Sequence, residues 1–223
     1  PSKKLNPKAL YVLQSEISVG IELTMFQGTP VGFELTMEPF KSCAIRCLAY
    51  DTTGPWIWMG SDEGIILFDL LRCGVTATIH IAHPVQNIVV LDQNIWVSVA
   101  EQGNLYVYDK FSLCLLRKLD AHAAPVSALV YMDGAVWSGS EDSSVKVWSS
   151  SHFNLLEDLS NFHSSDVLLL QSTLPSECHV LSSSKDYTMA VWKYCRKTHW
   201  EYSNDDIERV RSLVLRGSYS NTL

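Results

Sequence analysis

A pattern that recurs about every forty residues constrains the fold of this chain more than any other feature of its sequence. The chain has 223 residues, and four of its segments alternate apolar side chains and end in an aromatic residue. These four aromatic residues, spaced 40, 40 and 44 positions apart, are Phe68, Tyr108, Trp148 and Trp192. Ten positions before them stand Trp58, Ser98, Ser138 and Ser182, and six positions before them stand Asp62, Gln102, Asp142 and Asp186. Because several residue types in one register do not arise by chance, the pattern predicts a repeat protein.

Each repeat is predicted to consist of four β-strands. Valine, isoleucine, leucine and aromatic residues alternate with other residues at a period near two, between turns rich in glycine, aspartate and serine. A helical repeat of similar length would show a period of about 3.6 instead. The third repeat shows all four strands, in PVSALVY, AVWSGS, SVKVW and FNLLEDL. A four-stranded antiparallel unit of about forty residues is typical of a propeller blade, so the predicted fold class is all-β.

The pattern resembles the WD-repeat family of β-propellers. The Gly-His dipeptide of that family has the diverged counterparts Ala82-His83, Ala121-His122 and Phe162-His163. Its Trp-Asp dipeptide has the counterparts Phe68-Asp69, Tyr108-Asp109, Trp148-Ser149 and Trp192-Lys193. The resemblance covers roughly residues 42–197, and the predicted repeats are 42–83, 84–124, 125–165 and 166–203. It implies a rigid, non-catalytic scaffold that binds protein or peptide partners through its loops.

Serine, histidine and aspartate occur together in the third repeat, in the combination that a serine hydrolase requires. A nucleophilic serine needs a base within hydrogen-bond reach and a third group that orients the base. The combination of the third repeat recurs in the fourth, however, and a small domain rarely carries its active site twice. In the family that the chain resembles, a tryptophan donates to the serine, which bonds the histidine, which bonds the aspartate. We therefore expect two structural tetrads, which are His122, Ser138, Asp142 and Trp148, and His163, Ser182, Asp186 and Trp192.

The first two repeats depart from this tetrad pattern. The second repeat offers a partial tetrad, which we expect to be weaker, of His83, Ser98, Gln102 and Tyr108. In the first repeat a tryptophan stands in place of the serine, and the terminal Phe68 has no polar atom. Packing among Trp56, Trp58 and Phe68 is predicted to stabilise that repeat instead.

The two ends of the chain lie outside the recognisable repeats. GIELTM (20–25) and GFELTM (32–37) flank a turn sequence and predict a hairpin, so that residues 1–41 form a diverged blade or a separate N-terminal hairpin. THWEYS (198–203) is the expected outer strand of the fourth repeat, and 204–223 is a tail with a short helix or an extra strand that begins a further blade. The start at Pro1 suggests a piece of a longer protein. Either residues 1–41 close a five-bladed ring, or the ring is incomplete and upstream residues supply more blades, which is the interpretation that we favour.

Composition excludes several classes of function. The formal net charge of −7 disfavours nucleic-acid binding, which requires a basic face. No apolar run approaches the roughly 20 residues of a transmembrane helix, and no basic and apolar leader is present. The six cysteines lack the paired spacing of zinc sites. The sequence therefore predicts a cytoplasmic protein with reduced thiols, no metal and no cofactor.

The expected function is a protein–protein interaction scaffold within a larger signalling or membrane-trafficking regulator, such as a Roco-type kinase or a DENN-type Rab exchange factor. The alternative is a substrate-receptor or ubiquitin-binding propeller of a ubiquitin ligase, and a serine hydrolase is a remote alternative. In the family, partners bind a top face formed by the loops that enter the blades and the turns between second and third strands. The corresponding positions are Ser61, Pro84, Glu101, Pro125, Glu141, Asp166 and Lys185. Three of the seven are acidic and one is basic, so a basic or polar peptide is the expected partner.

Overall fold

Every regular element that the structure describes is a β-strand. The computed structural model describes residues 20–24, 34–38, 43–173, 179–193 and 212–216. Its strands form four four-stranded sheets and one two-stranded sheet, and all the pairs are antiparallel. Within the described residues, no helix is long and apolar enough to span a bilayer.

Each four-stranded sheet is built from strands that follow one another in the chain. Sheet 1 contains β3 (Ile45–Asp51), β4 (Trp56–Ser61), β5 (Gly64–Asp69) and β6 (Gly74–His80). Sheet 2 contains β7 (Val85–Val90), β8 (Asn94–Val99), β9 (Asn104–Asp109) and β10 (Leu115–Asp120). Sheet 3 contains β11 (Val126–Met132), β12 (Ala135–Ser140), β13 (Val145–Ser149) and β14 (Leu155–Asp158). Sheet 4 contains β15 (Val167–Ser172), β16 (His179–Ser184), β17 (Thr188–Lys193) and β18 (Ser212–Arg216).

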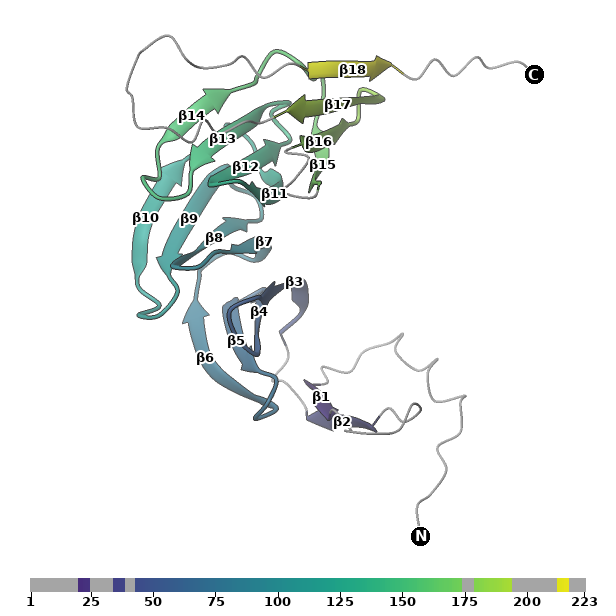
Figure 1. Cartoon of the computed structure of the whole chain (residues 1–223). Helices are drawn as coiled ribbons and strands as arrows, with labels where there is room; N and C mark the ends of the chain where they lie inside the picture. Colours follow the sequence, from purple (N-terminus) through teal and green to yellow (C-terminus); the bar gives the residue numbers. More distant parts are fainter. Residues whose placement is uncertain (1–19, 25–33, 39–42, 174–178, 194–211, 217–223) are drawn as a thin grey trace, which may run out of the picture.

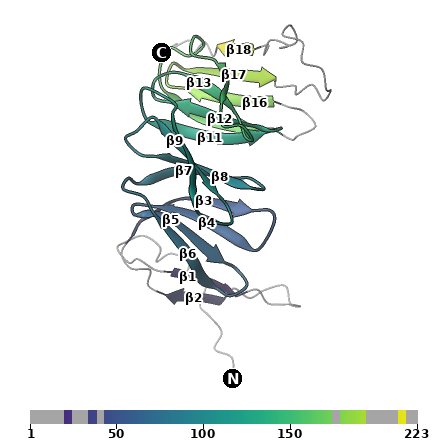
Figure 2. The ribbon, with the colours of Figure 1, turned by 90° about the vertical axis from the view of Figure 1, so that its left-hand side faces the viewer.

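The four sheets stack face to face along an open arc. Their first strands, β3, β7, β11 and β15, adjoin one another on the inside of the arc, and β6, β10 and β14 lie on its outside (Figures 1 and 2). Sheet 1 stands at one end of this series and sheet 4 at the other, so the series does not close into a ring. This is the radial arrangement of propeller blades, and it confirms the predicted all-β class and the incomplete ring.

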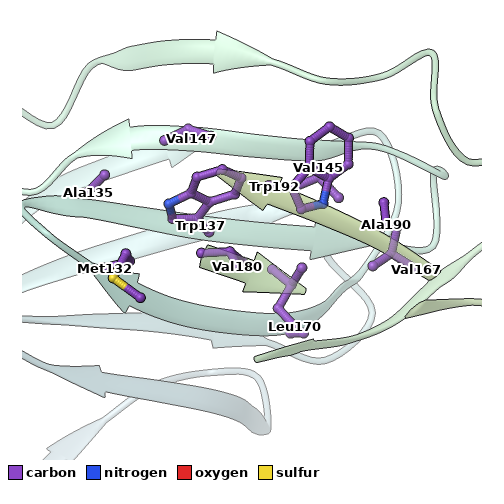
Figure 3. Packing of buried hydrophobic residues seen from close by; sticks show 11 residues of the cluster. Met132, Ala135, Trp137, Val145, Val147, Val167, Leu170, Val180, Ala190 and Trp192 are labelled. Atoms are coloured by element: carbon purple, nitrogen blue, oxygen red, sulfur yellow. The ribbon is translucent and has the colours of Figure 1, made fainter. Parts of the chain in front are cut away.

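The core consists of three apolar layers, one between each pair of neighbouring sheets. We call the face of a sheet that meets the preceding sheet its leading face, and the opposite face its trailing face. Each trailing face contributes a fully buried tryptophan of the second strand, which is Trp58, Trp96 or Trp137. Figure 3 shows the layer between sheets 3 and 4, where the ring centroids of Trp137 and Trp192 are 6.5 Å apart. Full burial of one aliphatic side chain contributes about 1.5–3 kcal/mol, and the tryptophans bury more area still.

Close approach between sheets depends on small residues in the second strands. A Cβ atom placed on Gly139 would lie 2.6 Å from Val167 Cγ1 of the next sheet, and one on Gly60 would lie 2.6 Å from Val85 Cγ1. Both distances are too short for carbon atoms in van der Waals contact. These two valines, with Val126 of sheet 3, hold the same position in three successive first strands, just before a register shift. The repeat therefore includes a valine that packs into a gap opened by a small residue of the preceding sheet.

In sheets 1 to 3, the turns between the third and fourth strands share one geometry that the sequence pattern did not reveal. The Asp69 carboxylate accepts the N–H groups of Leu71 and Arg72, and the Asp109 carboxylate accepts those of Phe111 and Ser112. In sheet 3 the Ser149 hydroxyl accepts one such N–H group, that of residue 152. The fifth residue of each turn has a positive φ, and these residues are Cys73, Leu113 and Phe153. A short polar side chain thus closes each turn, as in an Asx-turn.

The ends of the chain were predicted in part. β1 (Gly20–Thr24) and β2 (Glu34–Glu38) pair with each other, which confirms the predicted hairpin as a separate two-stranded sheet. The outer strand of sheet 4 differs from the expected one, because β18 and not residues 198–203 pairs with β17. The extra strand of the tail therefore completes a sheet and does not begin another. Residues 198–203 and the short helix expected near residue 204 lie outside the described residues.

Candidate functional site

The four residues of the third-repeat tetrad form one chain of hydrogen bonds. Trp148 Nε1 donates to Ser138 Oγ over 2.9 Å, and Ser138 Oγ lies 2.7 Å from His122 Nε2. His122 Nδ1 lies 3.1 Å from Asp142 Oδ2 and 2.9 Å from the Ser144 hydroxyl. Ser138 and Trp148 share the leading face because Trp148 pairs with Val136, two positions before the serine. The chain connects strand β13, strand β12, the loop before β11 and the turn after β12.

The protonation states of His122 and Asp142 fix which group donates and which accepts in each hydrogen bond of the tetrad. Burial lowers the pKa of His122, although the nearby Asp142 carboxylate acts in the opposite sense, so the imidazole is neutral at pH 7. Burial alone would raise the pKa of Asp142, but hydrogen bonds from Ser144 and the Ala123 N–H hold it below its ordinary value. Neutral imidazole has one donor and one acceptor. With Nδ1–H donating to Asp142, His122 Nε2 accepts the Ser138 hydroxyl proton, and every group has a partner.

The aspartate of this tetrad also fixes the turn in which it lies. Asp142 Oδ1 accepts the N–H and the hydroxyl of Ser144 at 3.0 and 2.6 Å, and Asp142 Oδ2 accepts the Ala123 N–H at 2.9 Å. The Ser140 hydroxyl accepts the Asp142 N–H and donates to the Ala124 carbonyl. These bonds tie the β12–β13 turn to the loop that enters the sheet. Such a bonded turn holds its exposed residues in a fixed geometry.

The fourth-repeat tetrad has the same arrangement, with the Thr188 hydroxyl in the place of the Ser144 hydroxyl. Trp192 Nε1 donates to Ser182 Oγ at 2.8 Å, and Ser182 Oγ lies 2.8 Å from His163 Nε2. His163 Nδ1 lies 3.0 Å from Thr188 Oγ1 and 3.4 Å from Asp186 Oδ2. Burial would raise the pKa of Asp186, but hydrogen bonds from Thr188 and a backbone N–H hold it well below its usual range. The Thr188 hydroxyl donates to Asp186 at 2.5 Å and links the imidazole to the carboxylate.

Burial and bonding of both serines oppose a nucleophilic role. Ser138 and Ser182 are 0% and 1% exposed, and the side chain of His122 is fully buried. Each serine oxygen already accepts an indole N–H, as described above. A nucleophile must reach a substrate carbon, and its oxygen must be free to attack it. The geometry is therefore that of a brace within the sheet.

In sheet 2 the structure does not join Ser98 to the histidine, because the register differs by one residue. His83 Nε2 contacts the Gln102 amide at 2.7 Å, as the partial tetrad requires. Tyr108, however, pairs with Ile95, so Ser98 lies on the opposite face from Tyr108. There the Ser98 hydroxyl accepts Asn87 Nδ2 at 3.0 Å, on the side that faces sheet 3. A one-residue change of register moves a side chain to the other face of a strand.

In sheet 1 the register shifts in the other direction and separates the three predicted aromatics. Phe68 pairs with Ile57, so Trp56 and Trp58 lie on the face opposite Phe68 and the expected three-residue cluster does not form. Met59, not Trp58, holds the position that corresponds to Ser138. Trp58 instead belongs to the layer between sheets 1 and 2, where its buried N–H has no hydrogen-bond acceptor among the described residues.

The predicted top-face residues lie along one edge of the stack. In sheets 1 and 2 the predicted turn residues are displaced by one position from the structurally equivalent ones, as in the tetrads. The backbone N–H of Glu141 donates to the Pro125 carbonyl, and that of Lys185 donates to the Asp166 carbonyl. The equivalent bonds in sheets 1 and 2 start from Asp62 and Ala100 and end at Ala44 and Pro84. Ser61 is buried and its hydroxyl donates to the Gly64 carbonyl, whereas Glu101, Glu141 and Lys185 are exposed. Ser61 is therefore the one predicted top-face residue that the structure withdraws from the surface.

The sequence did not predict the buried ion pair between sheets 1 and 2. Lys110 Nζ lies 3.1 Å from Asp51 Oδ2 and donates to Thr53 Oγ1 at 2.8 Å. The two charged side chains are only 5% and 2% exposed. Burial would raise the pKa of Asp51, but hydrogen bonds from Thr53 and Lys110 hold it below its ordinary value. Because the partners are far apart in the chain and neither recurs in other repeats, periodicity gave no signal for them.

Comparison with known proteins agrees with this architecture. The family described as "WD domain, G-beta repeat" matches residues 113–149, which include most of sheet 3. The structure of the RRP9 WD40 repeats superimposes with a TM-score of 0.65 at 19% identity, over 80% of this chain and 52% of that one. The chain therefore has the fold of a β-propeller, and its third repeat is similar to the WD-repeat family. The computationally designed Ika4 protein also superimposes, with a TM-score of 0.61 at 26% identity, over 69% of this propeller chain and 93% of Ika4.

One curated protein is similar over a shorter stretch. It is the probable serine/threonine-protein kinase pats1 of Dictyostelium discoideum, 36% identical over 67 residues. The match covers 30% of this chain but 2% of the kinase, so the chain spans a very small part of that relative.

Proposed function

We propose that this propeller is a non-catalytic protein-interaction scaffold of a larger cytoplasmic signalling or membrane-trafficking regulator. The observation that carries the proposal is the use of the serine and histidine side chains of sheets 3 and 4 as buried braces. The same bonds fix the β12–β13 and β16–β17 turns, which lie on the edge of the stack that carries the predicted top-face residues. We call this edge the top edge, and the outer side chains of its turns, such as Glu141 and Lys185, are exposed. The similarity to a protein named as a probable kinase supports the signalling context.

The partner that we propose for the top edge is a basic or polar peptide segment. Exposed Glu63, Glu101 and Glu141 occupy the second-to-third-strand turns of three successive sheets. The cations on this edge are already neutralised, since Lys185 pairs with Asp166 at 2.6 Å and Arg46 pairs with Asp62. Complementary charge raises association rates and excludes partners of like charge.

Affinity capture from cell extract with the 223-residue chain tests this proposal. Charge reversal in the variant Glu101→Lys/Glu141→Lys should remove most captured partners. Asp92→Lys/Glu157→Lys changes the net charge equally at positions away from the top edge and should leave capture unchanged. Recovery of GTPases or membrane-traffic proteins is expected. Recovery of ubiquitin-ligase subunits, or equal loss in both variants, would contradict the proposal.

Labelling of Ser138 or Ser182 by a fluorophosphonate probe would contradict the non-catalytic role.

A further inference from the structure

The two end faces of the stack carry the same contact positions as the three buried layers. In each layer a valine of the first strand packs against the preceding sheet, and Val85, Val126 and Val167 are at most 1% exposed. The residue of sheet 1 in this position is Ile45, because it pairs with the last residue of β4 as Val85 pairs with the last residue of β8. Ile45 is 40% exposed. Sheet 1 therefore presents the projecting side chain of a layer that the stack does not contain.

The trailing face of sheet 4 presents the corresponding gap. Gly60 and Gly139 open the gap in sheets 1 and 3, and Ser98 holds that position in sheet 2, where it is fully buried. The residue of sheet 4 in this position is Ser183, since it pairs with Leu169 as Gly139 pairs with Ala128. In the layer between sheets 2 and 3, Ser98 and Val126 are both buried, so a serine in this position is compatible with a packed neighbouring sheet. Ser183 would receive Ile45 as Ser98 receives Val126.

The surroundings of both positions are apolar and exposed. On the leading face of sheet 1, Leu48 and Tyr50 are 66% and 61% exposed. On the trailing face of sheet 4, Leu169 is 67% exposed, and Met189 is also exposed. In sheet 3 the counterparts of Leu48, Leu169 and Met189, which are Leu129, Ala128 and Val145, are buried, whereas Tyr131, the counterpart of Tyr50, is 43% exposed. Contiguous apolar surface of this kind marks an interaction site.

We propose that the trailing face of sheet 4 docks on the leading face of sheet 1 of a second copy of this chain. The interface continues the stacking that already joins sheets 1 to 4, and it uses different faces of the two partners. A head-to-tail contact of that type closes into a ring when its rotation fits, and two copies with four sheets each supply eight. Closed propellers have about four to eight blades, so this number is permitted.

The lengths of the superimposed proteins agree with a ring of two such stacks. The chain covers 46% of the computationally designed Ika8 protein, with a TM-score of 0.59, and 52% of the RRP9 WD40 chain. Each of those chains is therefore about as long as two stacks of this size. Closure by a second copy also removes both apolar end faces from water at once, which a single extra contact does not do.

Sedimentation velocity of the 223-residue chain tests the proposal. We expect the wild-type chain to sediment with twice the mass of one 25.0 kDa chain. Ile45→Glu blocks the leading face of sheet 1 and Leu169→Glu blocks the trailing face of sheet 4, so each variant should sediment as a single chain. Leu116→Glu, on the outer strand β10, is the matched control and should remain a dimer. Urea unfolding of every variant verifies that it is folded.

Mixing the two blocked variants separates loss of docking from loss of folding. The Ile45→Glu chain keeps an intact sheet 4 face and the Leu169→Glu chain keeps an intact sheet 1 face. An equimolar mixture should therefore form a heterodimer through one interface. A wild-type chain that stays monomeric would overturn the proposal and indicate that blades outside these 223 residues cover the ends. Open assemblies larger than two chains, or no heterodimer from two folded variants, would also overturn it.

Discussion

Sheets 3 and 4 each contain a complete hydrogen-bonded tetrad within the sheet, whereas Ser98 of sheet 2 and Asp51 of sheet 1 have partners that link neighbouring sheets. In sheets 3 and 4 the serine hydroxyl accepts the indole N–H and contacts the histidine of its own sheet. In sheet 2 the Ser98 hydroxyl is bonded by Asn87, whose amide also reaches the Ser127 carbonyl of sheet 3. Sheet 1 is joined to sheet 2 by the Asp51–Lys110 pair. The same strand order thus admits two ways of satisfying polar groups, and either one avoids the cost of a buried unpaired group.

Breaking the ion pair should have the largest effect of any single change in this comparison. Lys110→Met leaves the Asp51 carboxylate buried without its cation, and we expect a loss of about 3–5 kcal/mol in the free energy of unfolding, measured with urea. The double variant Asp51→Asn/Lys110→Met should recover most of that loss because no buried charge is left. Arg117→Met on the exposed strand β10 is the control and should change stability by less than about 0.5 kcal/mol. Equal loss in the single and double variants would show that Lys110 acts through packing alone.

Removing a tetrad carboxylate should cost less than breaking the ion pair. Asp186→Ala takes away the partner of Thr188 and of the Ser164 N–H, and we expect a loss of about 2–4 kcal/mol. Gln102→Ala is the matched change in sheet 2 and should cost less than about 1 kcal/mol. Similar values for the two variants, determined by urea unfolding at pH 7, would mean that the intact tetrad of sheet 4 contributes nothing beyond the partial one.

The pH dependence of stability should distinguish the same two sheets. The folded-state pKa of Asp186 is well below its ordinary value. As the pH falls below about 4, the unfolded chain therefore takes up a proton at this residue that the folded chain does not. This contribution is fully present above the unfolded pKa of about 3.9 and is lost as pH falls below it. Asp186→Asn should therefore flatten the curve of unfolding free energy against pH in that range, whereas Gln102→Glu should not. An unchanged curve for Asp186→Asn would count against the bonded carboxylate.

The smallest effect concerns the turn that the tetrad of sheet 4 fixes. Tyr187 is 86% exposed and has φ of 64°, a conformation that costs a bulky residue energy. Tyr187→Gly should stabilise the chain by about 0.5 kcal/mol because it removes that strain at the expense of some unfolded-state entropy. Tyr187→Ala keeps the strain and loses the ring, so it serves as the control in thermal unfolding. Destabilisation by glycine but not by alanine would show that the turn is not strained.

The repeat and its strands could be predicted because alternation at a period of two is a local property of the sequence. The tetrads of sheets 3 and 4 could be predicted as sets because Trp148 and Trp192 each pair with the residue 12 positions earlier. In sheet 1 that separation is 11, from Ile57 to Phe68, and in sheet 2 it is 13, from Ile95 to Tyr108. Counting back a fixed ten residues therefore selected the wrong face in those two sheets. The length of the turn between the second and third strands determines which residues pair, and a fixed spacing in the sequence does not take that length into account.

The contacts between sheets were the part that the sequence could not supply. Asp51 and Lys110 meet because the first two sheets stack, and neither residue has a counterpart in the other repeats to draw attention to it. The amide of Asn87 likewise meets carbonyl groups of the next sheet only once the sheets are in place. Such contacts depend on the packing of whole sheets, which no local pattern encodes.

A pair of double-mutant cycles tests the central claim, that a bonded tetrad exists in sheet 3 and not in sheet 2. The first cycle combines Ser138→Ala with Trp148→Phe, and the second combines Ser98→Ala with Tyr108→Phe. Because Trp148 donates to Ser138 at 2.9 Å, we expect a coupling energy of about 1 kcal/mol or more in urea unfolding. Ser98 and Tyr108 lie on opposite faces, so their coupling should be within about 0.3–0.5 kcal/mol of zero. Equal coupling in the two cycles would contradict the account.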